Sequence, residues 1–408
     1  MKPEIVPANP EGSRLQDDPD FSLVLGGPLY RLYLRTRLAQ PPLGLVTRRV
    51  VGISLICWLP LLLLAAFAGR FTRGVSIPFL YDVEVHTKFL LVLPLLIASE
   101  LLVHERIHKI VGQFTERGLI AGQDRPRFAE AIASTMRMRN SVVIELVMLA
   151  VVIAFGFWMG KGSLKLTLSA ITVSSWYAVD DGARLHLTAA GSYYALVSLS
   201  ILRFIQLRWY FRLFIWYRFL WQVKGLPLQF NFYHPDRAGG LGFLSASIIA
   251  FAPIFVAQTA LLAGVVFTRI RYAGDKLPSF TLEIAGVLLF FIVVSVLPLT
   301  FFSVKLERAG RIARREFGVL ASRYVNDFRR KWVQGDVRPS EPLLGTSDIQ
   351  SLADLANSYN VVSSISLLPV AQGALVRLAV LIASPLLPLL LTVIPLSEVI
   401  KRLFKMMF

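Results

Sequence analysis

Long apolar runs constrain the fold of this chain more than any other feature. Residues 50–69 contain no charged side chain, and residues 142–160 contain only Glu145. An apolar helix of about 20 residues is long enough to cross the roughly 30 Å hydrocarbon core of a bilayer. Only 17% of all residues are charged and 55% are hydrophobic, which leaves too little polar surface for a soluble protein of this size. The sequence therefore predicts an all-α integral membrane protein.

About seven transmembrane helices are expected, six of them regular and a seventh broken by Pro385 and Pro388. Proline interrupts the hydrogen bonding of a helix, so the seventh segment either completes a crossing or turns back as a re-entrant hairpin. The expected spans are residues 50–69, 89–103, 142–160, 193–223, 241–267, 282–302 and 374–394.

The distribution of Lys and Arg predicts the orientation. Seven of them precede the first span, and the following loops hold three, seven, three, five, three and ten, where the five include Arg208, Arg212 and Arg218 of the aromatic-basic helix into which the fourth span merges. Basic residues collect on the cytoplasmic side of a membrane, so we expect a multi-pass protein of a bacterial inner membrane with a cytoplasmic N-terminus. The net charge of +17 then indicates contact with anionic lipids rather than with nucleic acid.

Four regions are expected along the chain. Residues 1–49 form a cytoplasmic tail and an interfacial helix, and residues 50–303 form a six-span membrane domain with an outer β-hairpin near 164–188. Residues 304–372 form a cytoplasmic segment of amphipathic helices, and residues 373–408 form a C-terminal membrane segment and amphipathic tail. The helices of 305–359 either pack as a hairpin or lie on the membrane, and they offer a surface to a cytoplasmic protein partner.

Ionisable residues inside spans are costly to bury and are candidates for function. Glu100, Glu145 and Arg203 fall within expected spans, in the half that faces the cytoplasm. They form either a polar binding site that opens inward or structural ion pairs between helices. Arg208 and Arg212 continue the fourth span and are expected in a belt of Trp, Tyr and Arg at the membrane interface.

The segment from His234 to Gly240 joins this basic stretch to the fifth span. Asp236 can cap the incoming helix, and Gly239 and Gly240 allow close approach of the backbone. We expect His234, Asp236, Arg237 and the two glycines to bind an anion through free backbone amides, or else to form a tight helix start.

The same segment carries a resemblance. HPDRAGGLGFL, which begins at His234, resembles an HPDxAGGLGFL signature of multi-span bacterial inner-membrane proteins that have no established activity. SDIQSLADLANSY, which begins at Ser347, is similar to the same group. The resemblance extends over most of the chain and implies a membrane protein without implying any particular activity.

A second motif suggests a different chemistry. His104, Glu105 and His108 match H-E-x-x-H, in which two histidines on one helical face bind zinc and the glutamate acts as general base. His234 or Asp236 would supply the third ligand. The competing interpretation is an ordinary polar run where the second span leaves the membrane.

Two classes of function remain. The first is a non-enzymatic membrane protein without a cofactor, either channel-like or transport-like or else a scaffold or sensor that can form homo-oligomers. The alternative is an intramembrane zinc metalloprotease that uses residues 104–108. No nucleotide-binding or nucleophile motif adds a third.

Overall fold

The computed structural model describes residues 21–40, 43–160, 174–180, 185–335 and 347–392. The described part is mostly helical, with 78% of its residues in helices, and contains one small sheet of two strands. The helices and strands are α1 (Pro28–Arg35), α2 (Val46–Phe67), α3 (Val83–His86), α4 (Leu93–Glu116), α5 (Arg125–Arg139), α6 (Val142–Gly160), β1 (Ala178–Asp180), β2 (Leu185–Leu187), α7 (Ala189–Tyr193), α8 (Leu199–Gly225), α9 (Ser245–Ala250), α10 (Ala252–Ala273), α11 (Thr281–Val296), α12 (Ser303–Phe328), α13 (Ser347–Ser363) and α14 (Gln372–Ala383).

Six helical runs of the described residues are long and apolar enough to cross a membrane. They are Val46–Phe67, Val83–Glu116, Gly122–Phe157, Gly242–Ala273, Leu277–Val333 and Gln372–Thr392. This confirms a polytopic helical membrane fold. The fourth expected span corresponds to α7 and α8 and is not among the six, so the crossing by α8 stays a prediction.

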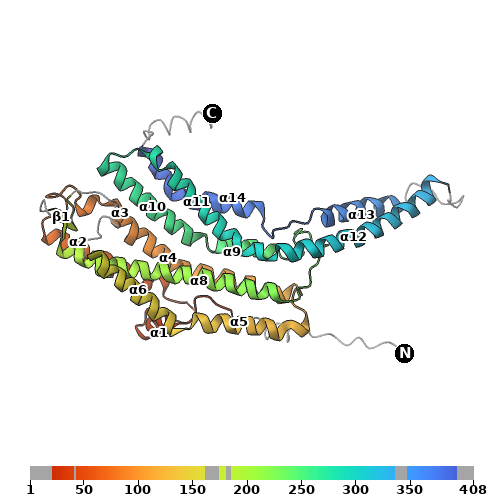
Figure 1. Cartoon of the computed structure of the whole chain (residues 1–408), viewed down its shortest axis with the longest axis horizontal. Coiled ribbons are helices and arrows are strands. Elements are labelled where there is room, and N and C mark those ends of the chain that lie inside the picture. The colour runs from red at the N-terminus through yellow and green to blue at the C-terminus, as the bar shows by residue number, and fades with distance from the viewer. Residues whose placement is uncertain (1–20, 41–42, 161–173, 181–184, 336–346, 393–408) are drawn as a thin grey trace, which may run out of the picture.

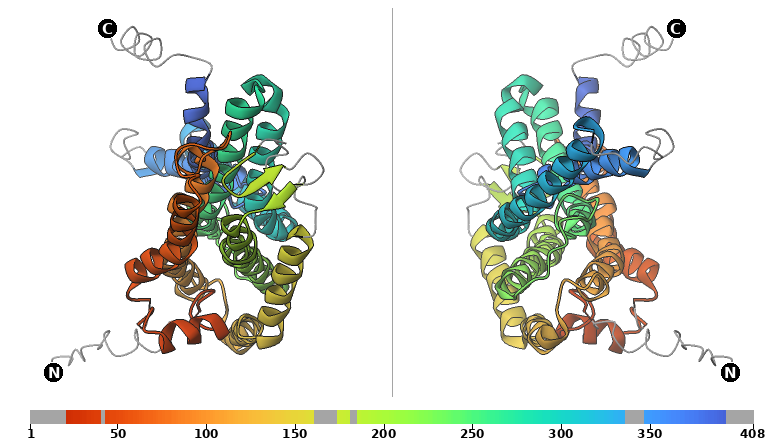
Figure 2. Two further views of the ribbon diagram at one scale, coloured as in Figure 1. Left: turned by 90° about the vertical axis from the view of Figure 1, so that its left-hand side faces the viewer. Right: turned by 90° about the vertical axis from the view of Figure 1, so that its right-hand side faces the viewer.

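The helices gather into a bundle with α4 and α8 near its centre. Helices α10, α11 and α14 lie along one edge, while α1, α5 and α6 lie along the opposite edge (Figures 1 and 2). Helix α8 contacts α4, α5 and α6, and its side chains Trp209, Trp216 and Phe219 are fully buried. Burying such large rings along its length fixes α8 as the central element of the described core.

The N-terminal segment differs from the expected interfacial helix. Only Pro28–Arg35 is helical, and the residues before it enter the core. Phe21 is fully buried, with its ring 4.7 Å from that of Phe219 and 6.3 Å from that of Trp216. The segment is therefore packed against α8 and does not lie only on the membrane surface.

A β-hairpin lies at one end of the bundle, as the sequence predicts. Strands β1 and β2 pair antiparallel, with Ala178 opposite Leu187. Trp176, just before β1, donates its indole N–H to the Asp82 carboxylate at 2.9 Å, which fixes the hairpin to the start of α3. The other expected hairpin residues, 164–173 and 181–184, lie outside the described part of the chain.

Helices α12 and α13, here called the arm, pack against each other and project beyond the opposite end of the bundle (Figure 1). The Tyr324 hydroxyl donates to the backbone carbonyl of Asp348 at 3.0 Å, and the Lys331 ammonium pairs with the Asp348 carboxylate at 2.8 Å. The Phe317 and Tyr359 rings stack at 6.2 Å. Of the two arrangements considered for these helices, the structure has the hairpin.

The last helix remains helical through its prolines. Helix α14 is followed directly by 3₁₀ turns over Ser384–Thr392, which contain Pro385 and Pro388. The tighter turns accommodate proline, which cannot donate a backbone hydrogen bond. No re-entrant turn occurs within residues 372–392, and residues 393–408 lie outside the described structure.

Candidate functional site

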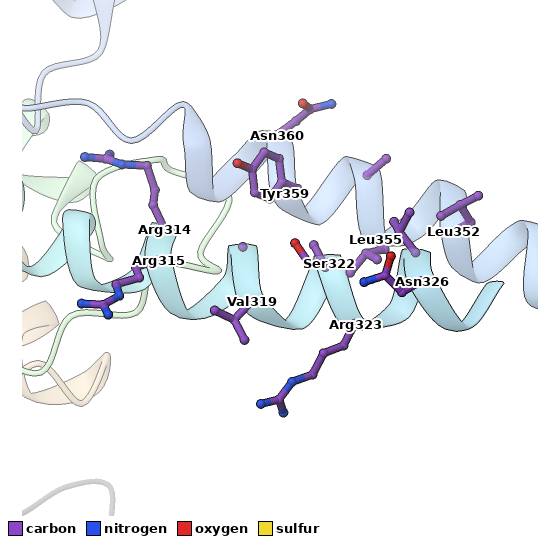
Figure 3. Close-up of a pocket in the computed structure, with 14 residues that line it drawn as sticks. Arg314, Arg315, Val319, Ser322, Arg323, Asn326, Leu352, Leu355, Tyr359 and Asn360 are labelled. Carbon is purple, nitrogen blue, oxygen red and sulfur yellow. The ribbon is translucent and has the colours of Figure 1, made fainter. Parts of the chain in front are cut away.

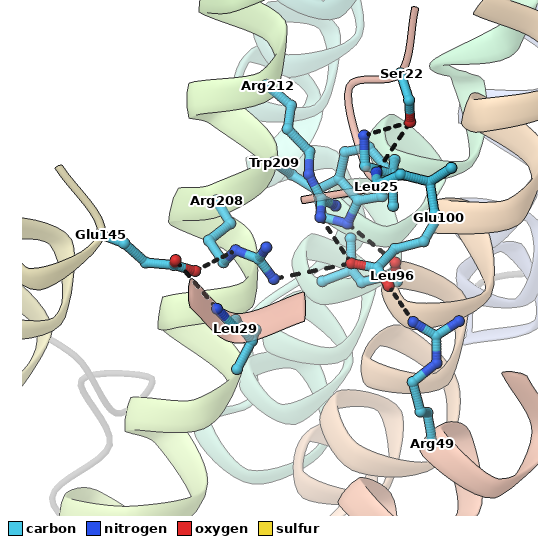
Figure 4. Close-up of polar contacts among 11 residues, drawn as sticks. Ser22, Leu25, Leu29, Arg49, Leu96, Glu100, Glu145, Arg208, Trp209 and Arg212 are labelled. Atoms are coloured by element: carbon cyan, nitrogen blue, oxygen red, sulfur yellow. Dashed lines mark hydrogen bonds and ion pairs between the residues drawn. The ribbon is translucent and has the colours of Figure 1, made fainter. Parts of the chain in front are cut away.

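A network of five charged side chains lies inside the bundle. Arg208 and Arg212 are one turn apart on α8 and therefore share a helical face. This face meets Glu100 on α4, Arg49 at the start of α2 and Glu145 in the first turn of α6 (Figure 4). Each of the five residues is less than a tenth exposed.

Glu100 is the centre of this network. Its carboxylate accepts hydrogen bonds from Arg49 Nη1 and Arg212 Nη2, both at 2.8 Å, and lies 3.9 Å from Arg208 Nη1. Three guanidiniums around one carboxylate satisfy its charge several times over. Removing one partner of such a buried pair leaves an uncompensated charge, which costs about 3–5 kcal/mol. Glu100 therefore ties α4 to α2 and α8.

Arg208 connects this centre to α6. Its Nε lies 3.1 Å from Glu145 Oε1. Glu145 Oε2 in turn accepts the backbone N–H of Leu29 at 3.2 Å, which attaches α1. Two of the predicted site residues, Glu100 and Glu145, are thus joined through an arginine.

Aromatic rings surround the guanidiniums. The Arg212 guanidinium lies 4.5 Å from the Trp209 ring centroid, and that of Arg49 lies 5.6 Å from the Tyr33 centroid. The Trp209 indole N–H donates to the backbone carbonyl of Leu96 at 3.0 Å. The rings exclude water and add cation–π attraction, so these guanidiniums are held in fixed positions.

The space beside the network is small. A cavity of about 20 Å³ lies next to Glu145, Arg208 and Arg212. A single water molecule needs about 10–15 Å³ of such volume, so the cavity has room for about one. Within the described residues, the network is therefore closer to a set of structural ion pairs than to a solute-binding site.

The location of Arg208 and Arg212 differs from the expected interface belt. Both side chains are buried and bonded to carboxylates of other helices. Arg49 is not predicted as part of the network, because it precedes the first apolar run. An acidic residue in one span together with arginines in another would have been the signal to look for a pair.

Arg203 lies apart from the network. Its guanidinium sits 4.7 Å from the centre of the Phe155 ring, and no ion pair joins it to a described carboxylate. The structure therefore brings together Glu100 and Glu145 but not Arg203.

Asp236 organises the segment that links α8 to α9. One carboxylate oxygen accepts the N–H groups of Ala238 at 2.9 Å and Gly240 at 3.2 Å, and the other accepts that of Gly242 at 2.9 Å. Burial raises the pKa of the Asp236 carboxyl group, but these three amides outweigh it and hold the pKa below its ordinary value. His234 Nδ1 accepts the backbone N–H of Asp236 at 3.2 Å.

The glycines serve this arrangement. Gly240 has φ of +93°, a region that side chains disfavour. A Cβ added at Gly242 would lie 2.8 Å from Cβ of Asp236. The Arg237 carbonyl also accepts the N–H of Ser366 at 2.7 Å, which fixes the chain between α13 and α14. The amides expected for an anion are bound to Asp236, so the contacts support the alternative of a tight helix start.

The H-E-x-x-H residues lie on α4. The His104 and His108 rings are 6.0 Å apart, His108 Nδ1 lies 3.2 Å from the backbone carbonyl oxygen of Phe21, and Glu105 is exposed. Among the residues that the structure describes, no three His, Cys, Asp or Glu side chains gather into a group that could hold a metal ion. The zinc hypothesis therefore gains no third ligand from the described residues.

A second charged cluster lies near the β-hairpin, and the sequence analysis missed it. Lys88 pairs with Glu84 and donates to the Tyr194 hydroxyl at 2.9 Å. Lys88 and Tyr194 lie in π-helical turns, Thr87–Val92 and Tyr194–Ser198. Lys88 directly precedes the expected span 89–103, so the sequence does not mark it as buried. The cluster joins α3 to the start of α8.

The arm carries a groove of about 900 Å³ between α12 and α13 (Figure 3). Small residues of α12 and apolar residues of α13 form much of its surface, and three arginines of α12 border it. The lining residues are Arg314, Arg315, Gly318, Val319, Ala321, Ser322, Arg323, Val325, Asn326, Leu352, Leu355, Ala356, Tyr359 and Asn360. No described Asp or Glu lines it.

The apolar side of the arm is largely unpartnered. Leu320 of α12 is 53% exposed and Ile349 of α13 is 46% exposed. Only Val362 of α13 is fully buried. The two helices thus contact each other without covering their apolar residues.

Comparison of the chain with models of protein families, with curated proteins and with solved structures finds no match. The resemblance of the His234 and Ser347 segments stays a prediction. What this polytopic membrane protein does must therefore be argued from its geometry.

Proposed function

We propose that this chain is a non-enzymatic scaffold of a bacterial inner membrane that presents its arm to a cytoplasmic protein. The main support is a contrast between two sites, the charged network inside the bundle and the groove of the arm. The charges inside the bundle are bonded to one another beside a cavity of about 20 Å³, whereas the arm has a groove of about 900 Å³. Among the described residues, the arm therefore offers far more room for a partner than the surroundings of the network do.

The network supports a scaffold over a channel or carrier. A transport site needs charged groups that face a space large enough for the solute. Glu100 and Glu145 instead bond to arginines of neighbouring helices. Helix α8 can cross the membrane in this proposal because those carboxylates compensate the charges of Arg208 and Arg212. The network then serves to hold the helices that carry the arm.

The orientation supports a cytoplasmic partner. The segment 303–373 holds ten Lys or Arg residues, the highest count of any loop, and basic loops favour the cytoplasmic side. Helix α12 and the turn after it continue to Val333, about 45 Å from Ser303 at 1.5 Å per residue. An extension of this length carries the groove well away from the spans.

Photo-cross-linking in living cells tests the proposal. A photoreactive amino acid at Ser322, which lines the groove, should give an adduct with a cytoplasmic protein. The same residue at Val304, which is exposed at the start of α12 and lies off the groove, should not give that adduct. The purified protein in liposomes should conduct no ion or solute. Flux that Glu145→Gln alters, without an adduct at Ser322, would overturn the scaffold in favour of transport.

A further inference from the structure

We propose that the groove of the arm binds an acidic amphipathic helix of the partner protein. This inference rests on the proposed function and specifies the chemistry of the partner. It follows from the shape, the charge and the surface of the groove.

The length of the groove fits a short helix. Its lining residues run from Arg314 to Asn326 along α12, which is roughly 18 Å at 1.5 Å per residue. A helix of about twelve residues spans the same distance. Recognition of this kind places the apolar face of an amphipathic helix into an apolar groove.

The surface of the groove allows a backbone to come close. Gly318, Ala321 and Ser322 lie side by side on α12, and a Cβ added at Gly318 would meet no atom within 4 Å. Leu352 and Leu355 of α13 line the other side (Figure 3). Small residues facing leucines give room for the apolar side chains of a third helix.

The charge of the groove selects an acidic partner. Arg314, Arg315 and Arg323 border it, and no described carboxylate does. A carboxylate on the polar flank of a docked helix would pair with Arg314, whose side chain faces the hollow, and the positive charge of the border suppresses neutral and basic competitors. The C-terminal stretch of this chain carries Lys401, Arg402 and Lys405, so its charge makes it a poor occupant.

A helical peptide is favoured over a lipid surface because the site is concave. Arg314 lies on the side of α12 that faces α13, while Val319 and Arg323 point away from α13 (Figure 3). A flat bilayer would contact one outer face of the arm and leave the hollow between the helices empty. A helix laid along the hollow contacts both sides.

Binding of a synthetic peptide to the full chain tests this inference. The chain is placed in nanodiscs of phosphatidylcholine, which carry no net charge. The probe is a fluorescent fourteen-residue peptide with leucines at helical spacing and glutamates on its flanks. A scrambled peptide of the same composition should bind at least about fivefold more weakly, because its apolar residues no longer share a face.

Charge reversal on the arm provides the matched comparison. Arg314→Glu should weaken binding roughly tenfold, because an attractive pair becomes repulsive. Arg308→Glu makes the same change at an exposed position of α12 off the groove and should alter binding by less than about twofold. Gly318→Leu should fill the groove and weaken binding, while circular dichroism shows an unchanged helix content.

Three results would overturn the acidic helix. They are equal binding of the scrambled peptide, no effect of Arg314→Glu, and binding of the chain only to vesicles that contain anionic lipid. If the Ser322 adduct still forms in cells, the scaffold stands and its partner has another chemistry. If the adduct is absent as well, the proposed function fails with it.

Discussion

Asp236 shows how one side chain can use up the donors of an apparent binding loop. Its carboxylate accepts three backbone N–H groups, from Ala238, Gly240 and Gly242. The sequence leaves two possibilities open for an acidic residue followed by glycines, an anion site and a tight helix start. It could not show that the carboxylate would turn back onto those amides, because that depends on the backbone torsions of the glycines. The backbone amides that could bind an anion are hydrogen-bonded to Asp236 of the same segment.

This arrangement predicts a pH-dependent stability. The folded pKa of Asp236 lies below its ordinary value of 3.8, so the contribution is complete above that value and is lost as the pH falls through the folded pKa. Asp236→Asn should lower the free energy of unfolding at pH 7 by about 1–3 kcal/mol, because the amide has one uncharged acceptor oxygen and its NH₂ group leaves at least one of the three backbone N–H groups without an acceptor. Apparent melting temperatures from tryptophan fluorescence measure this in detergent.

The comparison of wild type with Asp236→Asn isolates the residue from other acids. The difference between the two melting temperatures should shrink as the pH falls below about 3.8 and through the folded pKa, where the wild-type carboxylate becomes protonated. A difference that stays constant over this range would show that the carboxylate charge does not hold the loop.

At the scale of helices, α8 depends on its partners for burial. Arg208 and Arg212 would be too costly in a bilayer if α8 were alone. Their charges are compensated by Glu100 of α4 and Glu145 of α6. Hydropathy therefore fails to select α8, although it identifies the six more apolar runs. Periodicity and apolarity describe one helix at a time, and compensation between two helices is visible only once they are packed.

This dependence distinguishes Glu100 from Arg203. Both are ionisable residues inside expected spans and look equivalent in the sequence, but only Glu100 belongs to the network. Glu100→Gln should destabilise the protein by about 3–5 kcal/mol, because it leaves buried guanidiniums without their carboxylate. Arg203→Met should change stability by less than about 1 kcal/mol, because methionine replaces the packing against Phe155 and no described ion pair is broken. Yield and melting temperature of the purified variants provide the measurement.

A matched change in the same network serves as the control. Arg49→Met together with Glu100→Gln removes one charge of each sign and should recover part of the loss seen with Glu100→Gln alone. Equal effects of Glu100→Gln and Arg203→Met would contradict the view that the network, and not the mere presence of charge, fixes α8.

At the scale of the whole molecule, the crossing by α8 decides whether the β-hairpin end of the bundle and the arm lie on the same side of the membrane or on opposite sides. Between the loop that follows α2 and the arm, the chain passes through α4, α6, α8, α10 and α11. If α8 crosses, the number of crossings is odd and the two ends lie on opposite sides of the membrane. If α8 does not cross, the number is even and they lie on the same side. Figure 1 places the β-hairpin and the arm at opposite ends of the bundle, which supports a crossing.

Labelling of single cysteines shows whether the number of crossings is odd or even. The chain has one native cysteine, Cys57, which is fully buried and can be changed to alanine. In that background, an impermeant maleimide added to spheroplasts should label Thr72→Cys, in the exposed loop after α2. It should label Ser322→Cys on the arm only after the membrane is permeabilised. Ser279→Cys, exposed between α10 and α11, is the control for the reagent. Only α11 separates Ser279 from the arm, so Ser279 and Ser322 lie on opposite sides of the membrane whether or not α8 crosses. Labelling of Thr72→Cys and Ser322→Cys from the same side would show that α8 does not cross the membrane. The charges of Arg208 and Arg212 would then need no compensation by two carboxylates for a crossing.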